Sequence, residues 1–122
     1  MKAWMALAGT LALAACGDGD IKEVSRTPSP VGELDAVIGS MKAGESQPFL
    51  VTIVKTGENP GKGPRLLLTD QTSAPKVEWL DPDHVTIHCD GTARVWSYRN
   101  FWTNGSATIA VGLDCGTLGW RP

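Results

Sequence analysis

The two histidines, His84 and His88, have a chemistry that depends on the element carrying them. On a helix, this four-residue spacing would let both rings share one zinc ion. On a β-strand the rings would lie about 13 Å apart, too far for a single ion with ligands at about 2.1 Å. Because Val85 and Ile87 alternate with polar neighbours, we predict a strand with solvent-facing histidines, no metal site and no cofactor.

Other polar side chains show no pattern typical of a catalytic site. Ser106 follows an Asn-Gly pair and lacks the strand-to-helix elbow of hydrolase nucleophiles. Asp81, Asp83 and Asp90 lack the residue order of a calcium loop, so we expect turn aspartates that bond their own backbone. Carboxylates are scattered along the chain, and nothing singles out a pair for glycoside cleavage. We therefore predict no catalytic residue.

Residues 1–15 have the composition of an export signal. Lys2 supplies a basic start, and an apolar run follows over residues 3–13. Spanning a bilayer takes roughly 20 apolar residues, so this run is too short to cross a membrane but fits a secretory leader. Small residues precede Cys16. An ordinary leader with a chance cysteine is the alternative interpretation.

Leu13-Ala14-Ala15-Cys16 resembles the lipobox of bacterial lipoproteins. The resemblance implies that the leader is cut before Cys16 and that this cysteine is acylated on its thiol and new amino group. Several acyl chains together would anchor the chain stably to a bilayer. The implied location is the cell envelope. In a Gram-negative host, Gly17 in place of Asp implies no inner-membrane retention, hence the outer membrane or periplasmic face.

Length and charge limit the remaining organisation. We expect a signal peptide at 1–15, a lipidated tether at 16–20 and one β-domain at 21–122, a size that suits a single core. The chain has a formal net charge of −2 and no basic stripe, so nucleic acid is not an expected partner.

The fold class follows from hydrophobic alternation and turn residues. No amphipathic helical pattern appears after the leader, and short apolar or alternating runs are separated by Gly, Pro, Asn and Asp. We therefore predict an all-β, antiparallel, sandwich-like domain. The expected strands cover residues 21–25, 34–40, 49–55, 65–69, 76–80, 84–89, 92–98 and 107–115, with 49–55 as a central strand.

Asn104-Gly105 is a strong hairpin signal because a type I′ turn needs two positive φ angles. A two-residue loop would pair Trp102 with Ala107 and Trp96 with Leu113. This register places the aromatic stripe on the same face as the aliphatic one, so we predict core positions for Trp96, Tyr98 and Trp102. A sugar-binding aromatic platform is the alternative. Arg99 and Phe101 fall on the opposite face as candidate surface contacts, together with His84 and His88.

Cys89 and Cys115 remain as an even pair once Cys16 is assigned to lipid. In an oxidising compartment such a pair favours a disulfide. The bond requires strand 84–89 to lie directly beside strand 107–115. A tight Asp90-Gly91 hairpin would instead insert strand 92–98 between them and leave two buried thiols. We favour the disulfide.

The part after the leader resembles small exported lipoproteins with a single β-domain, through Ser29-Pro30-Val31-Gly32 and Glu78-Trp79-Leu80-Asp81. We expect a membrane-anchored envelope protein with a non-enzymatic binding or structural role. Its expected partners are the bilayer, through acylated Cys16, and an envelope protein or cell-wall component. The alternative is a small cell-envelope hydrolase or an inhibitor of a cell-wall enzyme, resting on the surface set Arg99, Phe101, His84 and His88.

Overall fold

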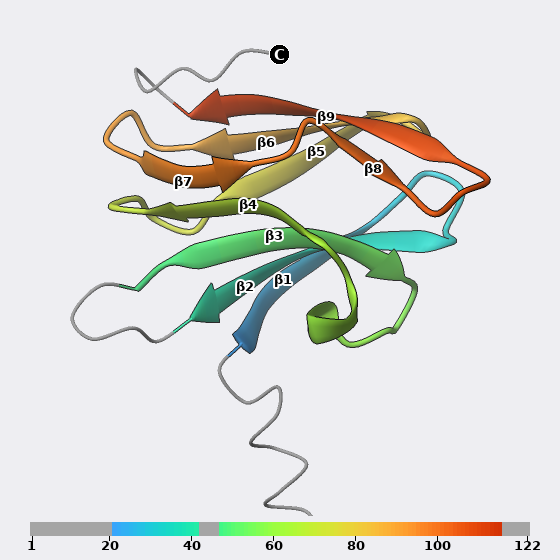
Figure 1. Cartoon of the computed structure of the whole chain (residues 1–122), viewed down its shortest axis with the longest axis horizontal. Coiled ribbons are helices and arrows are strands. Elements are labelled where there is room, and N and C mark those ends of the chain that lie inside the picture. Colours follow the sequence, from blue (N-terminus) through green and yellow to red (C-terminus); the bar gives the residue numbers. More distant parts are fainter. Residues whose placement is uncertain (1–20, 42–46, 116–122) are drawn as a thin grey trace, which may run out of the picture.

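The alternating runs form nine β-strands and one short 3-10 helix in residues 21–41 and 47–115, which are the residues that the computed structural model describes (Figure 1). Cys16 and the leader lie outside these residues. The strands are β1 (Ile21–Pro28), β2 (Leu34–Met41), β3 (Phe49–Lys55), β4 (Arg65–Asp70), β5 (Lys76–Asp81), β6 (His84–Cys89), β7 (Arg94–Tyr98), β8 (Phe101–Thr103) and β9 (Thr108–Cys115), and the helix is η1 (Pro60–Lys62).

Two sheets stack against each other, as Figure 1 shows. One has five strands in the order β1-β2-β3-β4-β7, and the other has four in the order β5-β6-β9-β8. Apolar side chains from both sheets form one core, with Ile38, Ile53, Leu67, Ile87 and Ile109 among the most buried. The predicted all-β, sandwich-like class is confirmed, and β3 is a central strand as expected.

One pairing departs from the antiparallel prediction. Strands β6 and β9 run parallel, with His84 opposite Ala110 and Cys89 opposite Cys115. The reason is the path between them: after β6 the chain crosses to the five-stranded sheet, adds β7 beside β4, and returns as β8. Strand β7 therefore does not separate β6 from β9, and the alternative with an inserted strand is wrong.

The β8–β9 loop is longer than predicted. Trp102 pairs with Ile109 and Thr103 with Thr108, so the loop holds four residues instead of two. The Asn104 side chain stabilises it, because its Oδ1 accepts hydrogen bonds from the backbone N–H of Ser106 and Ala107 at 3.0 and 2.9 Å. Trp102 still faces the core because the register moved by an even number of residues, which preserves the face.

The outer faces of the two sheets differ in how they are covered. On the five-stranded sheet, Thr52 and Val54 point away from the central core, yet both are buried. Gly63, which directly follows η1, packs over both side chains, and the Thr52 hydroxyl donates to the Pro64 carbonyl at 2.6 Å. The outward side chains of the four-stranded sheet are mostly exposed. That sheet therefore offers the more accessible face.

Candidate functional site

The outward face of the four-stranded sheet is low in its middle and higher at its sides. Strand alternation turns Thr86, Ala110 and Gly112 outward at the centre, while Leu80 and Phe101 stand on the flanking strands β5 and β8. A Cβ atom on Gly112 would lie 3.2 Å from the Thr86 hydroxyl oxygen, so glycine permits this close packing. Small central residues between larger lateral ones leave an open depression.

The depression consists of two adjoining hollows of about 610 and 300 Å³. His84, Asn100 and Ala110 line both of them. The larger hollow adds polar groups and one aromatic ring, and the smaller one is more apolar. The further residues are Asp83, Phe101, Ser106, Ala107 and Thr108 in the larger hollow, and Leu80, Val85, Thr86, Val111 and Gly112 in the smaller.

His84 is fixed at this depression by Asp81. The His84 Nδ1 atom lies 2.8 Å from Asp81 Oδ1, and the same oxygen accepts the Asp83 backbone N–H at 2.8 Å. Both contacts lower the pKa of the Asp81 carboxyl, and the contact with His84 has the larger effect. An imidazole oriented by a carboxylate is a common general base, but it needs a nucleophile within hydrogen-bond reach. The Ser106 hydroxyl donates to Asn104 Oδ1 at 3.1 Å, within its own loop.

Two of the predicted surface residues form a stacked pair beside His84. The Arg99 guanidinium carbon lies 5.5 Å from the centre of the Phe101 ring. Phe101 is 44% exposed and lines the larger hollow. Three members of the predicted surface set, Arg99, Phe101 and His84, therefore belong to one region.

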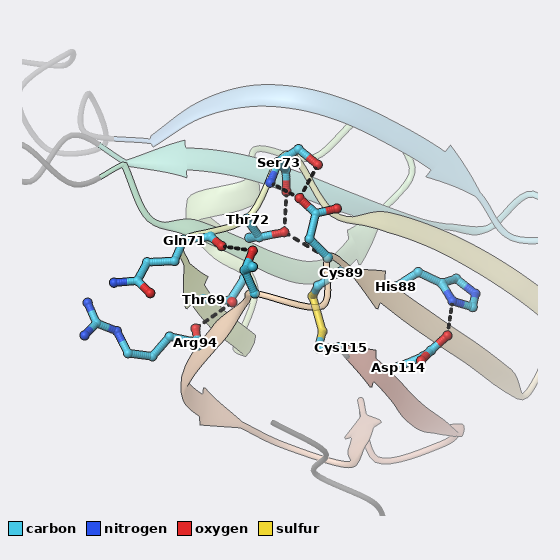
Figure 2. Close-up of a disulfide and its surroundings, with 11 residues drawn as sticks. Thr69, Gln71, Thr72, Ser73, His88, Cys89, Arg94, Asp114 and Cys115 are labelled. Carbon is cyan, nitrogen blue, oxygen red and sulfur yellow. Dashed lines mark hydrogen bonds and ion pairs between the residues drawn. A yellow bond between two sulfur atoms is a disulfide. The ribbon is translucent and has the colours of Figure 1, made fainter. Parts of the chain in front are cut away.

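His88 belongs to the other end of the same face. Its Nδ1 atom lies 3.0 Å from Asp114 Oδ2, and its Nε2 atom lies 3.0 Å from Glu78 Oε1. The contact with Asp114, then that with Glu78, raises the pKa of the imidazole. Figure 2 shows the His88 ring pointing at Asp114. His88 thus links β5, β6 and β9, so its position argues for a structural contribution.

The predicted disulfide is present between Cys89 and Cys115, whose Cα atoms are 4.3 Å apart (Figure 2). It joins the carboxyl ends of the parallel strands β6 and β9. The turn after Cys89 is fixed by Asp90, which accepts hydrogen bonds from the Ser73 backbone N–H and hydroxyl at 2.7 and 2.8 Å. These bonds lower the pKa of the Asp90 carboxyl. Asp90 stands at a turn, but it bonds the distant Ser73 and not its own backbone as predicted.

Trp96 contradicts the core prediction. Strand β7 pairs with β4, with Ser97 opposite Leu68 and Val95 opposite Thr69, so Trp96 is an extra residue with no partner in the pairing. This is a β-bulge, which re-aims side chains. The Trp96 side chain is 58% exposed. Tyr98, also predicted as core, is partly buried against the core, and its hydroxyl donates to the Val111 carbonyl.

An arginine and a buried carboxylate stand beside Trp96. The Arg94 guanidinium carbon lies 4.6 Å from the centre of the indole ring. Arg94 Nε and Nη2 donate to the two carboxylate oxygens of Asp70 at 3.1 Å each, and the Asp70 side chain is only 4% exposed. The hydrogen bonds from Arg94 have the largest effect and lower the pKa of the Asp70 carboxyl. A hydrogen bond from the Trp96 side chain lowers it as well. Arg94 and Trp96 belong to the aromatic platform that was the less favoured interpretation of the sequence, whereas nothing in the sequence pointed to Asp70. The local signal was that residues 94 and 96 share a strand face.

Residues 21–41 and 47–115 contain no group of three or more His, Cys, Asp or Glu side chains placed to hold a metal ion. Nor does this part of the chain hold a helix long and apolar enough to cross a membrane. No protein-family model, curated protein or solved structure matches the sequence.

Proposed function

We propose that this chain is an envelope lipoprotein whose β-domain is a non-enzymatic binding module. The Leu13-Ala14-Ala15-Cys16 sequence supports the anchor: the leader would be cut before Cys16 and this residue acylated. The pairing of Cys89 with Cys115 adds support, because it leaves Cys16 as the single cysteine available to lipid. In this arrangement the tether at 16–20 would hold the domain close to the bilayer.

The observation that carries the binding role is the open depression on the four-stranded sheet. It combines an aromatic ring, Phe101, with hydrogen-bonding side chains such as His84 and Asn100. Recognition sites commonly mix apolar lining with a few placed polar groups. These groups stand on or beside strands that are linked by the disulfide. Little conformational entropy would therefore be lost when a partner binds. An envelope protein or a cell-wall component is the proposed partner.

A cell-envelope hydrolase, or an inhibitor of a cell-wall enzyme, is the second candidate. The Asp81–His84 pair beside the depression favours the hydrolase, because the carboxylate orients the imidazole as a general base requires. A water molecule would then have to serve as the nucleophile, since the Ser106 hydroxyl is bonded to Asn104. The binding module is preferred because binding requires neither a general base nor a nucleophilic water molecule.

The full-length chain, expressed in its envelope and carrying a photo-crosslinking amino acid at position 101, tests the binding role. We expect one discrete crosslinked partner, reduced at least fivefold by His84→Ala. The same crosslinker at Val31, an exposed residue of the β1–β2 turn, is the matched control and should not capture that partner. Equal capture from both positions, or none from 101, would contradict the proposal.

Hydrolysis is tested on purified cell-wall sacculi with the full-length chain. Release of soluble fragments that is abolished by His84→Ala and kept in Val31→Ala would favour the hydrolase over the binding module. Mass spectrometry of the native protein tests the anchor separately: we expect loss of residues 1–15, an added acyl mass on Cys16, and two protons missing from Cys89 and Cys115.

A further inference from the structure

We propose a second binding site, beyond the depression, at the edge of the five-stranded sheet: a platform for a neutral saccharide made by Trp96, Arg94 and Gln71. These three residues form the Trp96 platform. Arg94 and Trp96 belong to β7, and Gln71 directly follows β4, the strand that pairs with β7. The proposal does not depend on the function proposed above.

Trp96 is exposed and fixed at the same time. The bulge turns its indole outward, where it is 58% exposed, and Arg94 lies against the ring at 4.6 Å. Buried Asp70 in turn holds Arg94 through two hydrogen bonds. A large aromatic side chain held in one position binds at low entropic cost. Such an arrangement suits a ligand that stacks on the ring.

Gln71, the residue after β4, has an unusual backbone conformation. Its φ angle is +59°, a left-handed conformation that residues other than glycine rarely adopt. The Thr92 hydroxyl holds this turn by donating to the Gln71 carbonyl at 2.9 Å. As Figure 2 shows, the side chains of Gln71 and Arg94 extend in the same direction. Within the residues that the structure describes, the Gln71 amide has no hydrogen-bond partner, so it can serve a ligand. Backbone strain of this kind is concentrated at functional sites.

The chemistry of these groups matches a sugar. An indole face stacks on the C–H face of a pyranose ring, while a planar amide and a guanidinium donate to adjacent hydroxyls. Arg94 covers one face of the indole, and the remaining exposed surface is open to a sugar ring. The charge of Arg94 is paired with that of Asp70, which favours a neutral saccharide over an acidic one.

A protein partner fits the surroundings of Trp96 less well. Protein interfaces have an apolar core of several residues. The neighbours of Trp96 on β7, Arg94 and Ser97, are however polar and exposed, and so is Gln71, which follows the paired strand β4. The exposed apolar side chains Val24 and Val31 belong to β1 and the β1–β2 turn, at the opposite edge of the same sheet. An isolated aromatic ring among polar groups is more suited to a single sugar ring.

The test is a titration of the full-length chain in phosphocholine micelles, which carry no sugar headgroup. The probes are homotetramers of N-acetylglucosamine, of glucose and of mannose, and binding is followed by the NMR signals of the backbone N–H groups of β4 and β7, which every variant keeps. We expect a saturable shift with at least one tetramer. Trp96→Ala should weaken binding at least tenfold and Gln71→Ala about threefold, whereas Trp96→Phe, which keeps a ring, should retain part of the affinity. Val31→Ala is the matched surface control and should bind as the unaltered chain does.

Three results would overturn the proposal. The first is no saturable shift with any tetramer. The second is binding of equal strength in Trp96→Ala. The third is binding that is lost in Phe101→Ala and kept in Trp96→Ala, which would move the saccharide to the depression on the other sheet. Because crosslinking from position 101 reports on the depression alone, failure of the Trp96 platform and failure of the proposed function are distinguishable.

Discussion

Trp102 and Trp96 occupy consecutive strands of one chain and have opposite surroundings. Trp102, on β8, is 6% exposed and donates its indole N–H to the Ile53 carbonyl across the core at 3.1 Å. Trp96, on β7, is 58% exposed and contacts Arg94 at the surface. Both belong to the same aromatic stripe of the sequence. Alternation can place two aromatic residues on the same face only if they belong to one continuous strand. Here the chain passes from the five-stranded to the four-stranded sheet between Trp96 and Trp102, so their surroundings differ.

The regions around the two tryptophans differ as well. The region of Trp102 belongs to the four-stranded sheet, where the disulfide joins β6 to β9 and His88 links β5, β6 and β9. The region of Trp96 is the edge of the five-stranded sheet, where β7 pairs with β4 and the contacts of Arg94 and Trp96 are at the surface. We therefore expect the buried contacts of the first region to contribute more to stability than the surface contacts around Trp96.

Trp102→Ala is expected to have the largest effect. It removes a buried ring and leaves the Ile53 carbonyl without its donor. The free energy of unfolding should fall by about 3–5 kcal/mol, as is typical of large aromatic truncations in a core. Urea unfolding followed by circular dichroism measures it. A loss below about 1 kcal/mol would remove the contrast between the two tryptophans.

Replacing Cys89 and Cys115 together by Ala comes next. The bond closes a loop with a sequence separation of 26 residues. On the chain-entropy model its loss should lower the free energy of unfolding by about 3 kcal/mol. Reduction of the unaltered protein should give a similar loss in the same urea experiment. Equal stability with and without the bond would show that the parallel β6–β9 pair does not need this link.

A smaller, pH-dependent effect is expected from His88. Its pKa in the folded protein is raised above the ordinary value of 6.5 by Asp114 and Glu78. Its stabilising contribution is therefore complete below about pH 6.5 and is lost as the pH rises through the folded pKa. Urea midpoints measured from pH 5.5 to 8.5 should fall with pH, and His88→Gln should flatten that fall. A parallel pH profile in the variant would contradict this contribution.

Trp96→Ala should have the smallest effect on folding. The side chain lies mainly in solvent, and surface substitutions usually change the free energy of unfolding by less than about 0.5 kcal/mol. The same variant is expected to lose saccharide binding, so stability and binding should separate at this residue. A destabilisation comparable with that of Trp102→Ala would show that Trp96 acts as a packing residue.

Local patterns were sufficient for much of the fold. The alternation of residues 84–89 predicts a strand with His84 and His88 on one face, and both lie on the outward face of β6. Once Cys16 is assigned to lipid, two cysteines remain, and this even number pointed to the Cys89–Cys115 bond. The hairpin at Asn104-Gly105, although not its loop length, and the inward face of Trp102 also follow from short-range signals, because face depends on a two-residue period.

The sequence by itself therefore determined most of the strands, the core faces of strands such as β6 and β9, and the cysteine pair, since these depend on neighbouring side chains and on turn chemistry. Only the tertiary structure decided the parallel pairing of β6 with β9, the transfer of β7 to the other sheet and the bulge at Trp96. Each of these is a choice of partner between segments distant along the chain. Such choices depend on how the whole core packs, and an alternating pattern fits several partners equally well.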